Sequence, residues 1–247
     1  MRLTVLGACG AWPEPGQASS GFLLRHEDFR LVIDLGYATM PRLLTHVDAA
    51  DVDAVFISHG HPDHCADLNP LLRARAMAGV RLPPLPVYAP AGALDAVLRL
   101  DRAETLAGSY QVVDVEPGTS LEIGPFWAET RLLPHWLPDL GVRLAAGGAV
   151  LAYTGDTGPS DEVVNLAVGA DLLLAEATFA DLAPDDVSAY LSTARVAGRQ
   201  AAAAGVRRLL LTHMWPGSDR SAFLAAAGAE YHGELRIAAP GLEAEIG

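Results

Sequence analysis

The residues with the clearest chemistry are four ligand-type side chains in one short loop: His59, His61, Asp63 and His64. Imidazole nitrogens and carboxylate oxygens are ligands that zinc and related divalent metals bind. Residues two apart in an extended segment point the same way, so His59 and His61 can bind one ion together. Pro62 then turns the chain, which lets Asp63 and His64 face a second ion. Four such residues so close together predict a metal centre.

Three more ligand-type residues each follow an apolar run elsewhere in the chain: His135, Asp156 and His213. Taken alone, each would more often be structural than functional. Together with the histidine loop, they supply the ligands that two ions would require. The remaining histidines match no such pattern and are expected at the surface: His26, His46 and His232.

These side chains need rigid elements to position them, and the apolar pattern predicts such elements. Val52–Ser58 reads as a strand that runs into the histidine loop, and Asp67–Ala78 reads as the helix after it. The other predicted strands are Leu3–Leu6, Gly21–Arg25, Leu31–Asp34, Val87–Ala89, Tyr110–Val115, Ser120–Ile123, Phe126–Leu133, Val142–Ala146, Ala149–Tyr153, Leu172–Ala175, Arg208–Leu211 and Leu235–Ala238. The other predicted helices are Ala91–Leu106 with a break near Leu100, Asp161–Val168, Thr193–Ala204, and Ser218–Ala227 with Ser218 or Asp219 as N-cap.

Both halves of the chain follow one plan, in which strands come first and then alternate with helices. Two sheets packed face to face, with helices outside, would bury this α/β pattern. The 247 residues contain no repeat, low-complexity tract or linker. We therefore expect a single domain over residues 1–247.

Composition narrows the class of protein and its partners. Hydrophobic residues make up 51% and charged residues 19%, which is typical of a globular protein. No apolar run is long enough to cross a membrane, and the N-terminal apolar stretch is too short for a signal peptide, so we expect a cytoplasmic protein. All 17 basic side chains are arginine and the net charge is −13, which opposes binding of a long polyanion. Cys9 and Cys65 are expected to be reduced core thiols.

The motif set resembles the metallo-β-lactamase superfamily and, within it, the ribonuclease Z-like branch. The stretches that carry the resemblance are Ile57–His64, Thr154–Thr157, Ala170–Phe179 and Leu211–His213. The similarity runs from residue 3 to about residue 245. It implies a four-layer αββα sandwich, with two mixed sheets face to face and helices outside.

Carried over residue by residue, the resemblance implies two divalent ions per chain, zinc or alternatively manganese. The first would be bound by His59, His61 and His135, the second by Asp63, His64 and His213, with Asp156 bridging them. Asp63 and Asp156 would therefore also be catalytic. Glu176 would contribute by orienting a ligand histidine.

The sequence departs from the ribonuclease Z pattern at two histidines. Ala175 and Leu191 stand where the enzymes that process transfer RNA carry histidines that can shuttle a proton. The long basic arm that grips transfer RNA has no counterpart here. These departures, with Val5–Gly10 and Ser19–Gly21, resemble a compact bacterial group related to class II-like cyclic nucleotide phosphodiesterases.

The function that these features favour is hydrolysis of small nucleotide phosphodiesters, cyclic ones included, by a metal-bridging hydroxide. The alternatives are a transfer RNA 3′-processing endonuclease and a lactone, ester or thioester hydrolase on the same site. The group that protonates the leaving oxygen stays open. The expected partner is a small anionic substrate, without long nucleic acid or membrane, and homodimer formation is left open. Three tryptophans near the motif loops either stack a nucleobase or plug the core: Trp12, Trp136 and Trp215.

Overall fold

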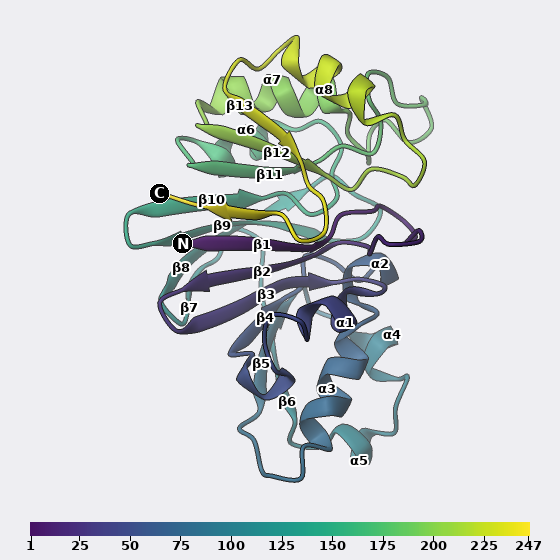
Figure 1. The fold of residues 1–247 in the computed structure, drawn as a ribbon, viewed down its shortest axis with the longest axis vertical. Helices are drawn as coiled ribbons and strands as arrows, with labels where there is room; N and C mark the ends of the chain where they lie inside the picture. Colours follow the sequence, from purple (N-terminus) through teal and green to yellow (C-terminus); the bar gives the residue numbers. More distant parts are fainter.

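The computed structural model describes residues 1–247 and contains two mixed seven-stranded sheets that face each other, with helices on both outer sides (Figure 1). This is the αββα sandwich that the sequence predicts. None of its helices is both long and apolar enough to cross a membrane.

The first sheet has the strand order β14-β1-β2-β3-β4-β5-β6. Its first four strands pair antiparallel, and β3 to β6 pair parallel. The C-terminal strand β14 lies beside β1, so the two ends of the chain meet (Figure 1). Its strands are β1 Arg2–Gly7, β2 Gly21–His26, β3 Phe29–Leu35, β4 Ala54–Phe56, β5 Leu85–Ala89, β6 Tyr110–Asp114 and β14 Glu243–Glu245.

The second sheet mirrors this plan with the order β13-β12-β11-β10-β9-β8-β7. Here β7 to β10 pair antiparallel, and β10 to β13 pair parallel. Its strands are β7 Ser120–Ile123, β8 Phe126–Leu133, β9 Asp139–Ala146, β10 Ala149–Tyr153, β11 Leu172–Glu176, β12 Arg208–Thr212 and β13 Glu234–Ile237.

The helices divide between the two outer faces. The first sheet is covered by α1 Thr39–Leu43, α3 Leu68–Ala76, α4 Asp95–Leu98 and α5 Ala103–Leu106, and the second by α6 Asp161–Ala167, α7 Ala194–Ala204 and α8 Arg220–Gly228. A 3₁₀ turn (η1, Ala49–Asp51) and a single helical turn (α2, Pro62–Cys65) complete the chain.

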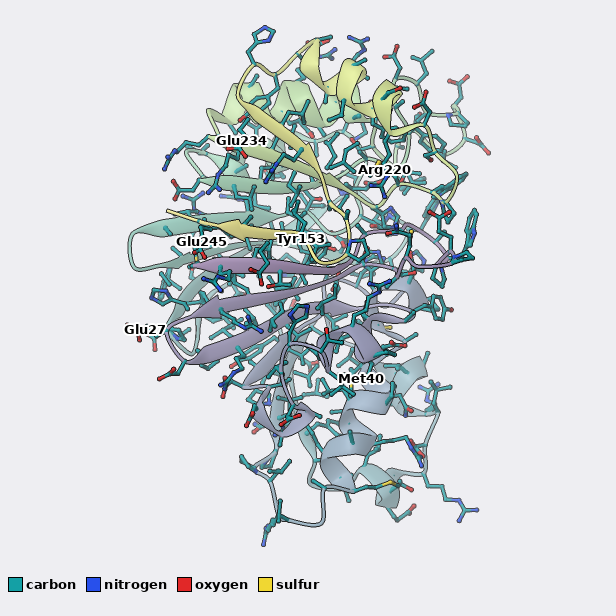
Figure 2. The ribbon with its side chains drawn as sticks, in the orientation of Figure 1. Glu27, Met40, Tyr153, Arg220, Glu234 and Glu245 are labelled. Atoms are coloured by element: carbon teal, nitrogen blue, oxygen red, sulfur yellow. The ribbon has the colours of Figure 1, made fainter.

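Apolar side chains point alternately to the two faces of each strand and form three apolar layers, one between the sheets and one under the helices on each outer side. Leu31 and Ile33 of β3 point into the core between the sheets, whereas Val32 points to the helices outside. The middle core contains the buried Tyr153, which lies between the sheets in Figure 2 and packs edge-on to Phe22 at 5.4 Å. Both faces of each sheet are therefore fixed, which makes the strand ends rigid supports for loops.

The structure confirms most predicted elements and corrects several boundaries. The strand predicted over Val52–Ser58 is shortened to β4, and the helix predicted over Ala91–Leu106 is two short helices separated around Leu100. The sequence analysis did not predict α1, η1, α2 and β14. Asp219, rather than Ser218, caps α8 by accepting a hydrogen bond from the Ser221 N–H. Cys9 and Cys65 are free and buried, as expected.

Candidate metal centre

The ligand-type residues come together at one edge of the sandwich, where strands of both sheets end. The histidine loop follows β4 of the first sheet. The second sheet contributes a residue after each of three strands: His135 after β8, Asp156 after β10 and His213 after β12. The face-to-face packing of the sheets thus joins residues far apart in the sequence.

The first group consists of His59, His61, His135 and Asp156, whose ligand atoms all lie within 4.8 Å of one another. His61 Nδ1 is 3.0 Å from His59 Nε2 and 3.0 Å from His135 Nε2. Asp156 Oδ2 is 3.8 Å from both Nε2 atoms. Three nitrogens and one carboxylate oxygen thus converge on one point, as in a tetrahedral metal site.

The second group consists of Asp63, His64, Asp156 and His213, all of them buried. His213 Nε2 is 3.2 Å from Asp63 Oδ2 and 3.1 Å from Asp156 Oδ2. His64 Nε2 is 3.1 Å from Asp156 Oδ1. Asp156 belongs to both groups, so its carboxylate lies where a bridging ligand would.

Unpaired atoms at the centre fit a pair of cations. His64 Nε2 and Asp156 Oδ1 are buried and lie 3.1 Å apart, but neither atom has the geometry of a hydrogen bond with the other or with any other group. A buried polar atom without a partner costs about 1–3 kcal/mol. A cation between these atoms would remove that cost, and the mixture of imidazole nitrogens and carboxylate oxygens suits zinc or manganese.

The outward-facing nitrogen of each of four candidate ligand histidines has a partner. His64 Nδ1 lies 2.7 Å from Asp34 Oδ2, and His59 Nδ1 lies 3.0 Å from Asp139 Oδ1. The Nδ1 of His135 lies 3.0 Å from the Tyr190 carbonyl oxygen, and that of His213 lies 3.0 Å from Thr178 Oγ1. Such contacts fix the ring orientation and leave Nε2 free to bind a metal.

Asp34, the partner of His64, also has several hydrogen bonds of its own. It is fully buried and accepts hydrogen bonds from the Ser58 N–H, the Ser58 hydroxyl and the Tyr153 hydroxyl, besides contacting His64. Its φ of 55° is in the left-handed region that a residue other than glycine rarely adopts. The local backbone strain is offset by these hydrogen bonds, which tie His64 to both sheets.

Glu176 reaches the centre through Thr178 rather than by touching a histidine. The Thr178 hydroxyl donates to Glu176 Oε1 at 2.6 Å and can accept from His213 Nδ1. The same carboxylate accepts the N–H groups of Thr157 and Ser192, at 2.7 and 3.1 Å. Glu176 therefore positions His213 and holds the loop that carries Asp156. Its pKa is raised to about 7, chiefly by burial and secondly by the negative charge of Asp156.

The electrostatics separate the histidines into two kinds. Burial is the main cause that lowers the pKa values of three of them, which favours the neutral, metal-binding ring: His59, His61 and His135. Burial also acts to lower the pKa of His64, but Asp156, Asp63 and Asp34 outweigh it and raise that pKa well above its ordinary value. The second group therefore has an excess of negative charge, which favours a bound cation.

Two glycines let neighbouring loops approach the centre. A Cβ at Gly36 would lie 1.8 Å from the Asp63 carbonyl oxygen, and one at Gly10 would lie 2.5 Å from the His213 carbonyl oxygen. Next to Gly10, the Ala11 N–H donates to Asp63 Oδ2 at 2.7 Å. Substituting either glycine would displace a candidate ligand.

The structure brings all seven predicted ligand residues together, and it adds Asp34, Asp139 and Thr178, which the sequence analysis missed. The other histidines lie outside the centre. His46 and His232 are exposed as expected, but His26 is only half-exposed, since its ring packs on Phe126 at 6.1 Å. Ala175 and Leu191 are both buried, and neither of these apolar side chains can accept or donate a proton.

The three tryptophans do not plug the core. Trp12 and Trp136 are each 49% exposed, and Trp215 is 37% exposed. All three lie in loops that also carry or contact candidate ligands. The alternative in which these rings fill the core beside the metals is therefore wrong.

Comparison with known proteins agrees with this fold. The family model described as "Beta-lactamase superfamily domain" matches residues 30–214. The probable metallo-hydrolase YhfI of Bacillus subtilis (strain 168) is 32% identical over 246 residues, 98% of this chain and 98% of the relative. Its crystal structure matches with a TM-score of 0.90 at 30% identity, covering 100% of this chain and 99% of that chain.

Ribonuclease Z proteins are also similar over their whole length. One from Mycobacterium bovis (strain BCG / Pasteur 1173P2) is 27% identical over 267 residues, 96% of this chain and 95% of the relative. The crystal structure of human tRNase Z, short form, matches with a TM-score of 0.82 at 25% identity over 100% of both chains. With a domain model that spans most of the sequence and a metallo-hydrolase relative matched end to end, this chain belongs to the metallo-β-lactamase superfamily.

Proposed function

We propose that this metallo-hydrolase is a phosphodiesterase of small nucleotides, cyclic ones included, and that its seven candidate ligands hold two divalent ions. The observation that carries the proposal is the pair of ligand groups sharing Asp156. Residues that share a carboxylate could hold two cations, and a pair of cations supplies charge stabilisation that suits in-line displacement at phosphorus.

The chain's own residues would hold the two ions and orient the ligand side chains. When bound, two ions would activate a water molecule and neutralise charge that develops on the phosphoryl oxygens. Asp139, Asp34, Thr178 and the Tyr190 carbonyl fix the ligand rings, so the site needs little reorganisation during the reaction. Asp63 is held by the Ala11 N–H and would be a ligand of the second ion.

Metal content is the first expected result. Protein purified without chelator should contain about two equivalents of zinc or manganese per chain by elemental analysis. The physical reason is the excess of buried carboxylate and lone-pair atoms at the centre, which a metal would satisfy. His232→Ala, which changes an exposed histidine outside the centre, should keep both equivalents, whereas Asp156→Ala should lose most of the metal. Less than one equivalent in the unmodified protein after careful reconstitution would contradict the two-metal site.

Reaction class is the second expected result. Metal-loaded protein should hydrolyse bis(p-nitrophenyl) phosphate, and a 3′,5′-cyclic nucleotide, with KM values up to the low millimolar range, roughly the upper end of common values. A lactone and a thioester of similar size should be turned over far more slowly. Activity confined to the lactone or thioester would reject the phosphodiesterase proposal and favour ester chemistry on the same site.

Transfer RNA 3′ processing is the second candidate, because ribonuclease Z relatives match nearly the whole chain. The apolar, buried Ala175 and Leu191 argue against it, since neither side chain can transfer a proton. We therefore place it behind the small-diester activity.

A further inference from the structure

Two pairs of exposed aromatic side chains flank the candidate metal centre, one beside each ligand group. We propose that these pairs are stacking platforms for the planar bases of a small nucleotide diester. One platform is Trp136 with Tyr190, and the other is Trp12 with Trp215. This inference rests on the proposed phosphodiesterase function and names how its substrate is held.

The first platform adjoins the first ligand group. Trp136 follows His135, and the two ring centroids are 5.1 Å apart. Tyr190 packs against Trp136 with centroids 5.2 Å apart and ring planes inclined by only 32°. The Tyr190 carbonyl lies 3.0 Å from His135 Nδ1, so the backbone that carries this aromatic residue also orients a candidate ligand.

The second platform adjoins the second ligand group. Trp215 comes two residues after His213, and Trp12 follows Ala11, whose N–H donates to Asp63. The two indole centroids are 5.9 Å apart, with the rings inclined by 42°. Phe179 supports Trp215 from the side, edge-on at 5.3 Å. Each platform therefore lies close in the sequence to residues that belong to, or contact, a different ligand group.

The exposure and bonding of these rings fit a binding role. All four are 37–49% exposed, although aromatic rings gain most stability when buried. None of the three indole N–H groups donates a hydrogen bond within the chain, whereas the chain's fourth tryptophan, Trp127, donates to Glu129. These rings therefore keep exposed surface and indole donors that the chain does not use, and every nucleobase offers a π-face that could stack on such a ring.

The presence of two platforms predicts different affinities for substrates with one base and substrates with two. A diester with a base on each side of the phosphate can use both platforms at once, while its phosphate lies over the metals. A 3′,5′-cyclic mononucleotide has one base and can use only one. We expect the two-base dinucleotide adenylyl-(3′,5′)-adenosine to bind more tightly than cyclic adenosine monophosphate.

The experiment measures KM and equilibrium binding of both compounds to metal-loaded Trp136→Ala and Trp215→Ala. Loss of one base–aromatic stack corresponds to roughly 5- to 150-fold in affinity. For the dinucleotide, KM should rise at least about fivefold in both variants, with a much smaller change in kcat. For the cyclic nucleotide, only one of the two variants should show the rise. Trp136→Phe and Trp215→Phe keep an aromatic face and should retain most of the affinity.

Trp127→Ala is the matched control. Trp127 is 48% exposed, like the platform rings. It lies near the start of β8, whereas His135 follows the other end of that strand. If the platform variants behave like Trp127→Ala with both compounds, the stacking proposal is overturned, even with phosphodiesterase activity intact. Binding by isothermal titration separates the two proposals. If the unmodified protein binds the dinucleotide, the platform variants weaken that binding, and no small phosphodiester is hydrolysed (dinucleotide, cyclic nucleotide or bis(p-nitrophenyl) phosphate), stacking stands and the proposed function fails. If the unmodified protein binds neither compound, the stacking proposal is overturned.

Discussion

Asp63→Asn and His64→Ala are each expected to lower kcat/KM for bis(p-nitrophenyl) phosphate by more than about 100-fold. Loss of an outer partner of a metal ligand typically costs 10- to 100-fold in metal affinity or activity, and loss of the ligand itself should cost more. Both residues are buried in the second group, close to Asp156 and His213. Removing either one leaves the opposite charges of that group unbalanced as well as removing a ligand atom.

The controls separate loss of the centre from loss of the fold. Asp48→Asn and His232→Ala make the same chemical changes at exposed positions outside the centre and should leave activity unchanged. Circular dichroism should show that the Asp63 and His64 variants remain folded, because the apolar layers on both sides of each sheet are untouched. Near-normal turnover in a folded Asp63→Asn or His64→Ala protein would mean that the catalytic centre lies elsewhere.

The ligand residues could be predicted from the sequence because their signal is local. His59, His61, Asp63 and His64 share one loop, and the remaining candidates each follow a buried strand. Strand ends at one sheet edge lie together in this kind of sandwich, so a ligand-type residue after an apolar run is informative. Asp34 carries the same signal at the end of β3 and could have been found by it.

Asp139 and Thr178 could not be found in this way, because their roles depend on the tertiary structure. Asp139 begins β9, and only the packing of the two sheets brings it to His59. Thr178 acts by connecting Glu176 with His213, residues from neighbouring strands. The short elements were missed for a similar reason. β14 is a Glu-Ala-Glu segment of only three residues, too short for its alternation to stand out in the sequence, and its strand conformation follows from pairing with β1.

The largest expected contrast between substrates is that small diesters will be cleaved much faster than precursor transfer RNA. The reason lies in the charge around the centre as well as in the whole chain's net charge of −13. The loops that carry or contact the candidate ligands contain no arginine: residues 8–20, 57–61, 134–138, 154–160, 177–193 and 213–219. The longest of them, residues 177–193, contains the exposed Asp185 and Asp186, and Asp181, which pairs with Arg195.

A long RNA gains most of its affinity from contacts between cationic side chains and its phosphates, and each missing contact weakens binding. The acidic loops would repel those phosphates beyond the reach of the metals. A small diester has only the charge that the ions themselves neutralise, and its bases would contact the uncharged aromatic platforms. We therefore expect kcat/KM for bis(p-nitrophenyl) phosphate or a dinucleotide to exceed that for precursor transfer RNA by at least about 100-fold at physiological salt, since that ratio corresponds to only about 2.7 kcal/mol.

The measurement is a side-by-side assay of one preparation, with a ribonuclease Z as the positive control for the RNA substrate. Lowering the salt concentration weakens screening, so repulsion between acidic loops and RNA should make cleavage of the RNA slower still. A protein that used cationic contacts to bind RNA would instead improve steeply as salt is removed. Efficient, site-specific trimming of the precursor, strengthened at low salt, would therefore reject the small-diester proposal and establish RNA processing in its place.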